Sequence, residues 1–96
     1  MSDVIEQAVT ILNEKLSGAD IGGSAKFSIE GEGDIIMDDD GARAGDDSAD
    51  VTLSADADTF KSILDGETNP TSAFMSGKLT VDGDMGMAMK LASALA

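Results

Sequence analysis

The sequence predicts an α+β fold in which helices cover a single sheet of five strands, most of them antiparallel. Apolar residues recur with the 3.6-residue period of a helix near both ends of the chain. Between residues 24 and 54, short apolar segments separated by glycine and aspartate have the pattern or the length of strands. Ninety-six residues suffice for one domain with a modest core, so we expect a single domain over residues 1–96.

The first half of the chain should form one helix and then four strands. A helix is expected over residues 3–17, with Gly18 as its left-handed end. Its apolar stripe consists of Val4, Ile5, Ala8, Ile11, Leu12 and Leu16. The strands are expected over residues 24–30, 34–38, 42–44 and 49–54. The short turns between them, among them the hairpin signal Asp40-Gly41, suggest an antiparallel meander.

The second half should contain three helices and one more strand. A helix over residues 56–64 ends at Gly66, and Asn69-Pro70 has the residues that begin the next one, which runs to about Met75. A fifth strand is expected over residues 78–82. Asp84 then caps a last helix that reaches toward Leu95, and this capping role is favoured over a phosphate-binding turn because a carboxylate stands where the anion would bind.

The composition excludes several functions. A net charge of −13 repels phosphates, so we expect no nucleic-acid partner and only weak or transient contact with membranes. Because there is no Cys and no His, we expect no cofactor, no metal site and no catalytic residue, and the protein should not be an enzyme. No apolar run is long enough to span a membrane, and neither a signal peptide nor a peroxisomal signal is visible, so a cytoplasmic location is expected.

The acidic run Asp38-Asp39-Asp40-Gly41 does not match a calcium loop. If Gly41 is the sixth position of an EF-hand loop, the first ligand would be Ile36, which has no side-chain oxygen. A solvated hairpin turn is favoured instead. Weak, nonspecific binding of divalent ions by the aspartates of residues 38–40, 46 and 47 stays open.

The last helix is apolar on nearly all sides. Only Lys90 and Ser93 interrupt Met85, Met87, Ala88, Met89, Leu91, Ala92, Ala94 and Leu95. Such a helix needs cover on more than one side, which one small sheet does not supply. It either completes the core and packs on a second copy of the chain, or it borders a site for flexible apolar ligands, for which methionine is well suited. This helix alone does not separate the two.

The segment from Asp50 to Leu91 carries a longer pattern. It contains Asn69-Pro70, then Ala73-Phe74, then Gly77-Lys78-Leu79 and Gly83-Asp84-Met85, and it ends in a methionine-rich helix at Lys90-Leu91. This pattern closely resembles the C-terminal half of domains of the sterol carrier protein-2 (SCP-2) family. The first half agrees with that family in element order.

The resemblance implies an apolar tunnel between sheet and helices that binds or transfers a long-chain lipid such as a fatty acid, a fatty acyl-CoA or a sterol-like molecule. By position, the tunnel wall would consist of Phe60, Ile63, Leu64, Phe74, Met75, Leu79, Val81, Met85, Met89 and Leu95. Its far side would consist of Leu12, Leu16, Phe27 and Ile29.

Unlike the basic animal members of the family, this chain is acidic, and it has the look of a stand-alone bacterial protein, for which a fatty acid or acyl-CoA is a better expectation than a sterol. The alternative is a small accessory module that dimerises through its apolar C-terminal helix. We therefore expect a monomer or a weak homodimer.

Overall fold

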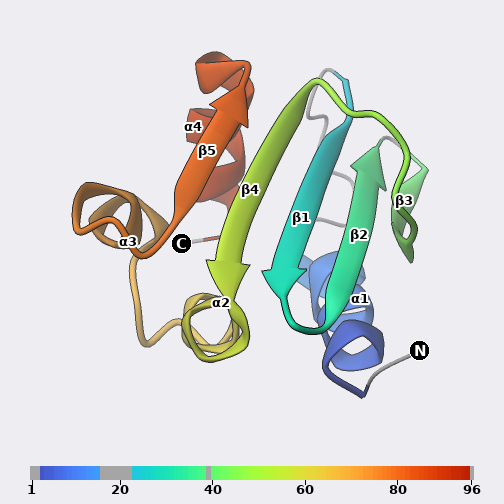
Figure 1. Ribbon diagram of the computed structural model, residues 1–96, viewed down its shortest axis with the longest axis horizontal. Helices are drawn as coiled ribbons and strands as arrows, with labels where there is room; N and C mark the ends of the chain where they lie inside the picture. Colours follow the sequence, from blue (N-terminus) through green and yellow to red (C-terminus); the bar gives the residue numbers. More distant parts are fainter. Residues whose placement is uncertain (1–2, 16–22, 39, 96) are drawn as a thin grey trace.

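The computed structural model describes residues 3–15, 23–38 and 40–95 and shows a sheet of five strands with four helices (Figure 1). The elements follow one another in the predicted order. They are α1 (Asp3–Lys15), β1 (Ala25–Glu30), β2 (Gly33–Asp38), β3 (Gly41–Ala44), β4 (Val51–Asp56), α2 (Ala57–Leu64), α3 (Pro70–Met75), β5 (Thr80–Gly83) and α4 (Met85–Leu95). The α+β prediction is confirmed, while the expected helix end at Gly18 lies outside the described residues.

The strand order is β3-β2-β1-β4-β5, and the predicted meander is wrong at one junction. The pairs β1–β2, β2–β3 and β4–β5 are antiparallel, but β4 lies beside β1 and runs parallel to it, with Phe27 opposite Leu53. The physical reason lies in residues 45–50, a link of six residues that is longer than a typical hairpin turn. This link carries the chain back across the end of the sheet, where Val51 and Leu53 join the core beside β1.

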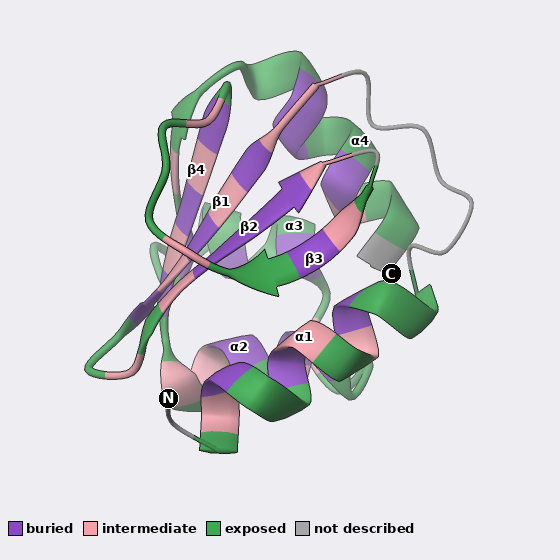
Figure 2. Ribbon diagram, turned by 90° about the vertical axis from the view of Figure 1, so that its right-hand side faces the viewer, coloured by how far each residue is buried: buried purple, intermediate pink, exposed green. Residues whose placement is uncertain are grey.

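The helices pack on one face of the sheet. Alternate residues of β1 and β4 are buried, and α1 packs on β2 and β3, α2 on β1 and β4, and α4 on β4 and β5 (Figure 2). The largest fully buried side chains are Phe27, Ile5, Leu12, Ile35, Leu91 and Val51. The rings of Phe27 and Phe60 lie 5.6 Å apart between centroids, a favourable tilted contact that joins the sheet to α2. Within the described residues, no helix has the length and apolar character needed to cross a membrane.

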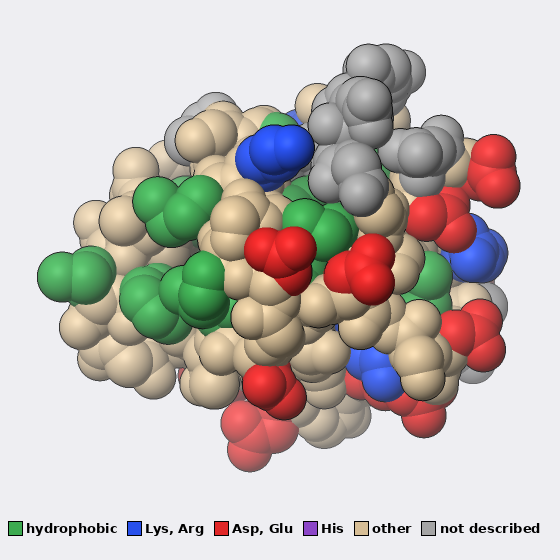
Figure 3. Space-filling model, turned by 90° about the horizontal axis from the view of Figure 1, so that it is seen from above, with side chains coloured by type: hydrophobic (Ala, Val, Ile, Leu, Met, Phe, Trp, Pro, Cys, Tyr) green, Lys and Arg blue, Asp and Glu red, His purple; other side chains and the backbone are tan. Residues whose placement is uncertain are grey.

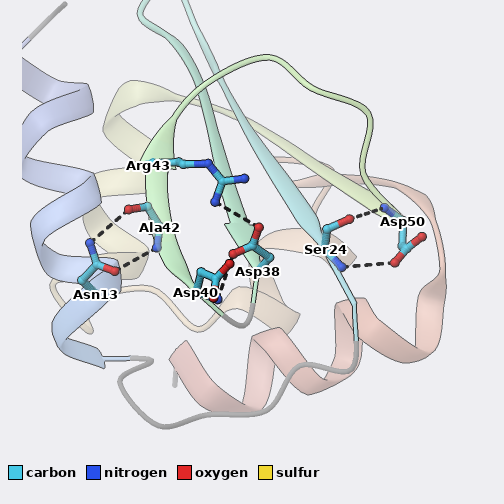
Figure 4. A network of polar contacts seen from close by, with 7 residues as sticks. All are labelled: Asn13, Ser24, Asp38, Asp40, Ala42, Arg43 and Asp50. Carbon is cyan, nitrogen blue, oxygen red and sulfur yellow. Dashed lines mark hydrogen bonds and ion pairs between the residues drawn. The ribbon is translucent and has the colours of Figure 1, made fainter.

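Polar side chains fix the edge strand and its turn (Figure 4). The Asn13 side chain of α1 donates a hydrogen bond to the Ala42 carbonyl of β3 at 3.1 Å and accepts one from the Ala42 N–H at 2.8 Å. Asp38 accepts a hydrogen bond from the Asp40 N–H and pairs with Arg43 at 3.0 Å, and this guanidinium lowers the pKa of the Asp38 carboxyl. Asp38 and Gly41 pair across the β2–β3 hairpin, and within the described residues no group of three or more acidic side chains could hold a metal ion.

Candidate functional site

An apolar hollow lies between the β1-β4-β5 side of the sheet and the helices α2, α3 and α4. Its void volume is about 530 Å³ when the part open to solvent is counted, but the centre of a water molecule can move through only about 40 Å³ of it. It is lined by Phe27, Leu53, Phe60, Ile63, Pro70, Thr71, Phe74, Leu79, Val81, Met85, Ala88, Met89 and Ala92. Ligand sites for small molecules have volumes of about 300–1,000 Å³. The enclosed 40 Å³ is far smaller than that, so a long ligand would have to displace side chains of the lining.

Helix caps set the two short helices over this hollow. The Asp56 carboxylate accepts a hydrogen bond from the Thr59 N–H at 2.7 Å, and this contact lowers the pKa of Asp56 and starts α2. The helical repeat then places Phe60 and Ile63 on the inner face of α2. Asn69 caps α3 in the same way, by accepting from the N–H groups of residues 71 and 72. The cap at Asn69 was predicted and the cap at Asp56 was not; together they turn apolar residues of α2 and α3 toward the same space.

Asp50 positions the wall that α4 forms. Its carboxylate accepts a hydrogen bond from the Ser24 N–H, and its own N–H donates to Ser24, which joins the start of β4 to the start of β1 (Figure 4). Its carbonyl accepts from the Asp84 N–H at 3.1 Å, one residue before α4 begins. Gly83, the last residue of β5, has a φ of 110°, and a Cβ at this position would collide with the Asp50 carbonyl oxygen. Asp84 caps α4 by accepting from the Met87 N–H, as predicted.

The wall helix α4 presents two apolar faces. Met87, Ala88 and Leu91 are buried against the sheet. The neighbouring face, Met85, Ala88, Met89 and Ala92, lines the hollow. Met85 and Met89 remain 46% and 56% exposed, because nothing in the described part of the chain covers them. The feature singled out in the sequence, a helix with more apolar surface than the sheet can cover, is thus present in the fold.

The hollow offers almost no polar chemistry. Thr71 contributes the one polar side chain of its lining as far as the chain is described, and no ionisable side chain lines it. A hydroxyl without a neighbouring base has no means of activation. The arrangement favours burial of an apolar ligand and gives no residue set for acid–base or nucleophilic chemistry.

The structure brings seven of the ten predicted wall residues together. Phe60, Ile63, Phe74, Leu79, Val81, Met85 and Met89 line the hollow, as does Phe27 from the predicted far side. Leu64 is buried on the side of α2 that faces α1, and Met75 is 79% exposed outside the hollow. Leu12 and Ile29 belong to the core cluster and not to the lining. Leu16 and the side chain of Leu95 lie outside the described residues.

Five lining residues were missed: Leu53, Pro70, Thr71, Ala88 and Ala92. Leu53 lies opposite Phe27 only because β1 and β4 pair in parallel, which the sequence pattern did not indicate. Ala88 and Ala92 could have been found, because they stand three and seven residues after Met85 and so share its side of a helix.

Comparison with known proteins decides which family this is. A sequence model of the SCP-2 sterol transfer family matches residues 7–96. The chain belongs to this family. The same fold is seen in the solution structure of sterol carrier protein-2 from Aedes aegypti in complex with palmitate. The two chains superpose with a TM-score of 0.80 at 23% sequence identity, over 100% of this chain and 97% of that one. Sterol carrier protein domain 2 of Helicoverpa armigera has a TM-score of 0.79 at 23% identity, over 96% of this chain and 85% of that one.

Among curated relatives, hydroxysteroid dehydrogenase-like protein 2 of Danio rerio is 43% identical over 82 residues, which are 77% of this chain and 20% of the relative. This chain therefore spans about one fifth of the length of the curated relatives it matches. These relatives are vertebrate proteins, so the expectation of a stand-alone bacterial protein finds no support among them.

Proposed function

We propose that this SCP-2 domain binds the hydrocarbon part of a long-chain lipid, a fatty acid in the first place, in the hollow under α4, and that it contributes binding and not chemistry. The observation that carries this proposal is the lining itself: thirteen residues, from six elements and the loop before β5, converge on one space, and twelve of their side chains are apolar. The palmitate bound to the structurally similar mosquito protein supports a ligand of this kind.

Burial of the tail supplies the affinity. Each methylene removed from water contributes about 0.8 kcal/mol, so a tail of twelve methylenes contributes roughly 10 kcal/mol before the costs of association. Because the empty hollow is narrow, the tail must move side chains aside. Phe74, Met85 and Met89 are only half buried, and the two methionines have flexible, unbranched side chains, so this movement requires little loss of packing.

The charge of the chain separates the candidate lipids. A net charge of −13 repels the phosphates of an acyl-CoA, whereas a fatty acid has one negative charge and a sterol none. The hollow also offers no cationic side chain for a phosphate within the described lining. We therefore place fatty acids before acyl-CoA as ligands of this chain.

Titration with a fluorescent long-chain fatty acid tests the proposal. Phe74→Asp places a carboxylate beside the buried tail and should weaken binding at least ten-fold, while Gln7→Asp, an equal charge change on the exposed side of α1, should have no effect. Circular dichroism verifies that both variants fold. Absence of saturable binding by the parent protein, or unchanged affinity in a folded Phe74→Asp variant, would refute a fatty-acid site in this hollow.

A second candidate function is dimerisation through α4, which the exposure of Met85 and Met89 favours. Native mass spectrometry of protein purified from cells separates the two. A monomer that carries an acyl-chain mass supports the lipid-binding module. A dimer without ligand supports an interaction module.

A further inference from the structure

We propose that the apolar patch beside the hollow docks on the surface of an uncharged lipid bilayer, with the mouth of the hollow toward the lipid. We define this docking patch as Phe74 and Met75 of α3 with Met85 and Met89 of α4. The inference rests on the proposed function, because it concerns how the hollow exchanges its ligand.

The docking patch borders the hollow. Phe74, Met85 and Met89 belong both to the lining and to the surface, with exposed fractions between 39% and 56%. Met75 is different, because it is 79% exposed, lies outside the lining and is no part of the core. Neither folding nor ligand burial accounts for an apolar side chain at this position.

The charge of the protein is divided along the chain in a way that favours this surface. Residues 1–67 contain 17 of the 19 acidic and four of the six basic residues, and so carry the whole net charge of −13. Residues 68–96, which form α3, β5 and α4, contain two acidic and two basic residues and are neutral. Figure 3 shows hydrophobic side chains gathered at the end that α3 and α4 occupy, whereas the acidic side chains seen in this view lie over the middle and the other end.

This division decides how the protein can approach a bilayer. Contact through the acidic part would remove many carboxylates from water, which is unfavourable. Contact through the neutral part removes mainly methionine and phenylalanine from water, which is favourable. Lys78 and Lys90 are both exposed in this part and can extend their amines to the phosphates of zwitterionic lipids while their stems lie along apolar surface.

The size of the docking patch argues against a second copy of the chain as its occupant. With about 200 Å² for a whole side chain of this size, the four exposed fractions amount to roughly 400 Å². A stable interface between two proteins buries about 800 Å² on each partner. An area of this size suits a reversible contact. A protein that takes up a fatty acid at a bilayer and then leaves it requires such a contact.

The experiment uses Met75, since this residue lies in the docking patch and outside the hollow. We expect transfer of a fluorescent fatty acid from phosphatidylcholine vesicles to be at least five-fold slower in Met75→Asp, and flotation of the protein with these vesicles to fall in parallel. Gln7→Asp adds the same charge to the acidic part of the chain and should match the parent protein in both measurements. Met75→Gln should fall in between, because it removes apolar surface without adding charge.

Equilibrium affinity for the same fatty acid, measured without vesicles, keeps this inference apart from the proposed function. It should be equal in the parent protein and in Met75→Asp. If the parent protein binds no fatty acid, the proposed function fails. If it binds fatty acid and Met75→Asp takes it from vesicles at the parent rate, the docking patch is refuted. A concentration-dependent dimer that Met75→Asp abolishes, with no change in vesicle transfer, would also refute it and assign the patch to a second copy.

Discussion

The two halves of the sheet are covered by helices in different ways. Over β2 and β3, α1 packs through a narrow apolar stripe, and Ile5, Ala8 and Leu12 are fully buried. Over β4 and β5, α4 brings two apolar faces to a sheet that can cover only one, and Met85 and Met89 stay half exposed. The first half is closed and the second is open. Apolar residues on a helix therefore form core or ligand-binding surface depending on how much sheet lies opposite them.

The sharpest test of the closed half is Leu12→Ala. Because Leu12 is fully buried, the substitution should leave a cavity and reduce the free energy of unfolding by about 2–5 kcal/mol. Urea denaturation measures this loss. At a temperature where the variant is folded, its affinity for a fatty acid should stay within two-fold of the parent value. A loss below about 1 kcal/mol would show that the closed half is loosely packed.

The open half should respond in the opposite way. We expect Met85→Ala combined with Met89→Ala to change the free energy of unfolding by less than about 1 kcal/mol, because both side chains are largely exposed. Affinity for a fatty acid should fall about ten-fold, because the buried tail loses contacts with both side chains. If urea denaturation and ligand titration instead showed a large stability loss with unchanged affinity, α4 would be ordinary core.

The division of charge predicts a dependence on salt and lipid composition. With one quarter of the phosphatidylcholine replaced by phosphatidylserine, vesicle association at low salt should be a few-fold weaker, because the acidic part of the chain is repelled. Flotation should show that this difference disappears near 1 M salt, where the Debye length is about 3 Å. Tighter binding to the anionic vesicles at low salt would contradict a repulsive acidic part.

The smallest expected effect concerns the cap of α2 and its pH dependence. The hydrogen bonds from Thr59 lower the pKa of Asp56 below the ordinary value of 3.8, so the ionised cap stabilises the fold above that pH and loses this contribution as the pH falls through its folded pKa. Asp56→Asn keeps a capping oxygen without the charge. The difference in melting temperature between the two proteins should be constant above pH 5 and shrink below pH 4. A difference independent of pH would mean that the charge of Asp56 plays no part.

Most of the fold could be predicted because its signals are local. Helical periods, the caps at Asn69 and Asp84, and the Asp40-Gly41 hairpin each involve a few neighbouring residues. The parallel pairing of β1 with β4 could not be predicted, because it depends on which strand buries more apolar surface in the centre of the sheet. Asn13 shows the same limit. It stands outside the apolar stripe of α1, a position that predicts contact with water, yet its side chain hydrogen-bonds to Ala42 of β3.

The residues of the candidate site could be predicted where the family resemblance supplied their positions. They were harder to predict where the packing of side chains determines which residues line the hollow. Phe74 and Met85 lie in the motifs that resemble the family, and both line the hollow. Met75 lies in the same motif, but one further step along a helix turns its side chain away from the hollow and into solvent. The pattern of apolar residues in the sequence does not show which of their side chains contact one another in the folded protein.

The parallel pairing of β1 with β4 also sets the order in which the chain can fold. The β1–β2 and β2–β3 hairpins join near neighbours in sequence and can form within microseconds. The β1–β4 ladder joins residues 26 positions apart, and α4 is the last element of the chain. The floor of the hollow, Phe27 beside Leu53, and its wall both depend on these late contacts. A nascent chain that has formed only α1 and the hairpins has no cavity for a lipid, so loading must follow completion of the whole domain.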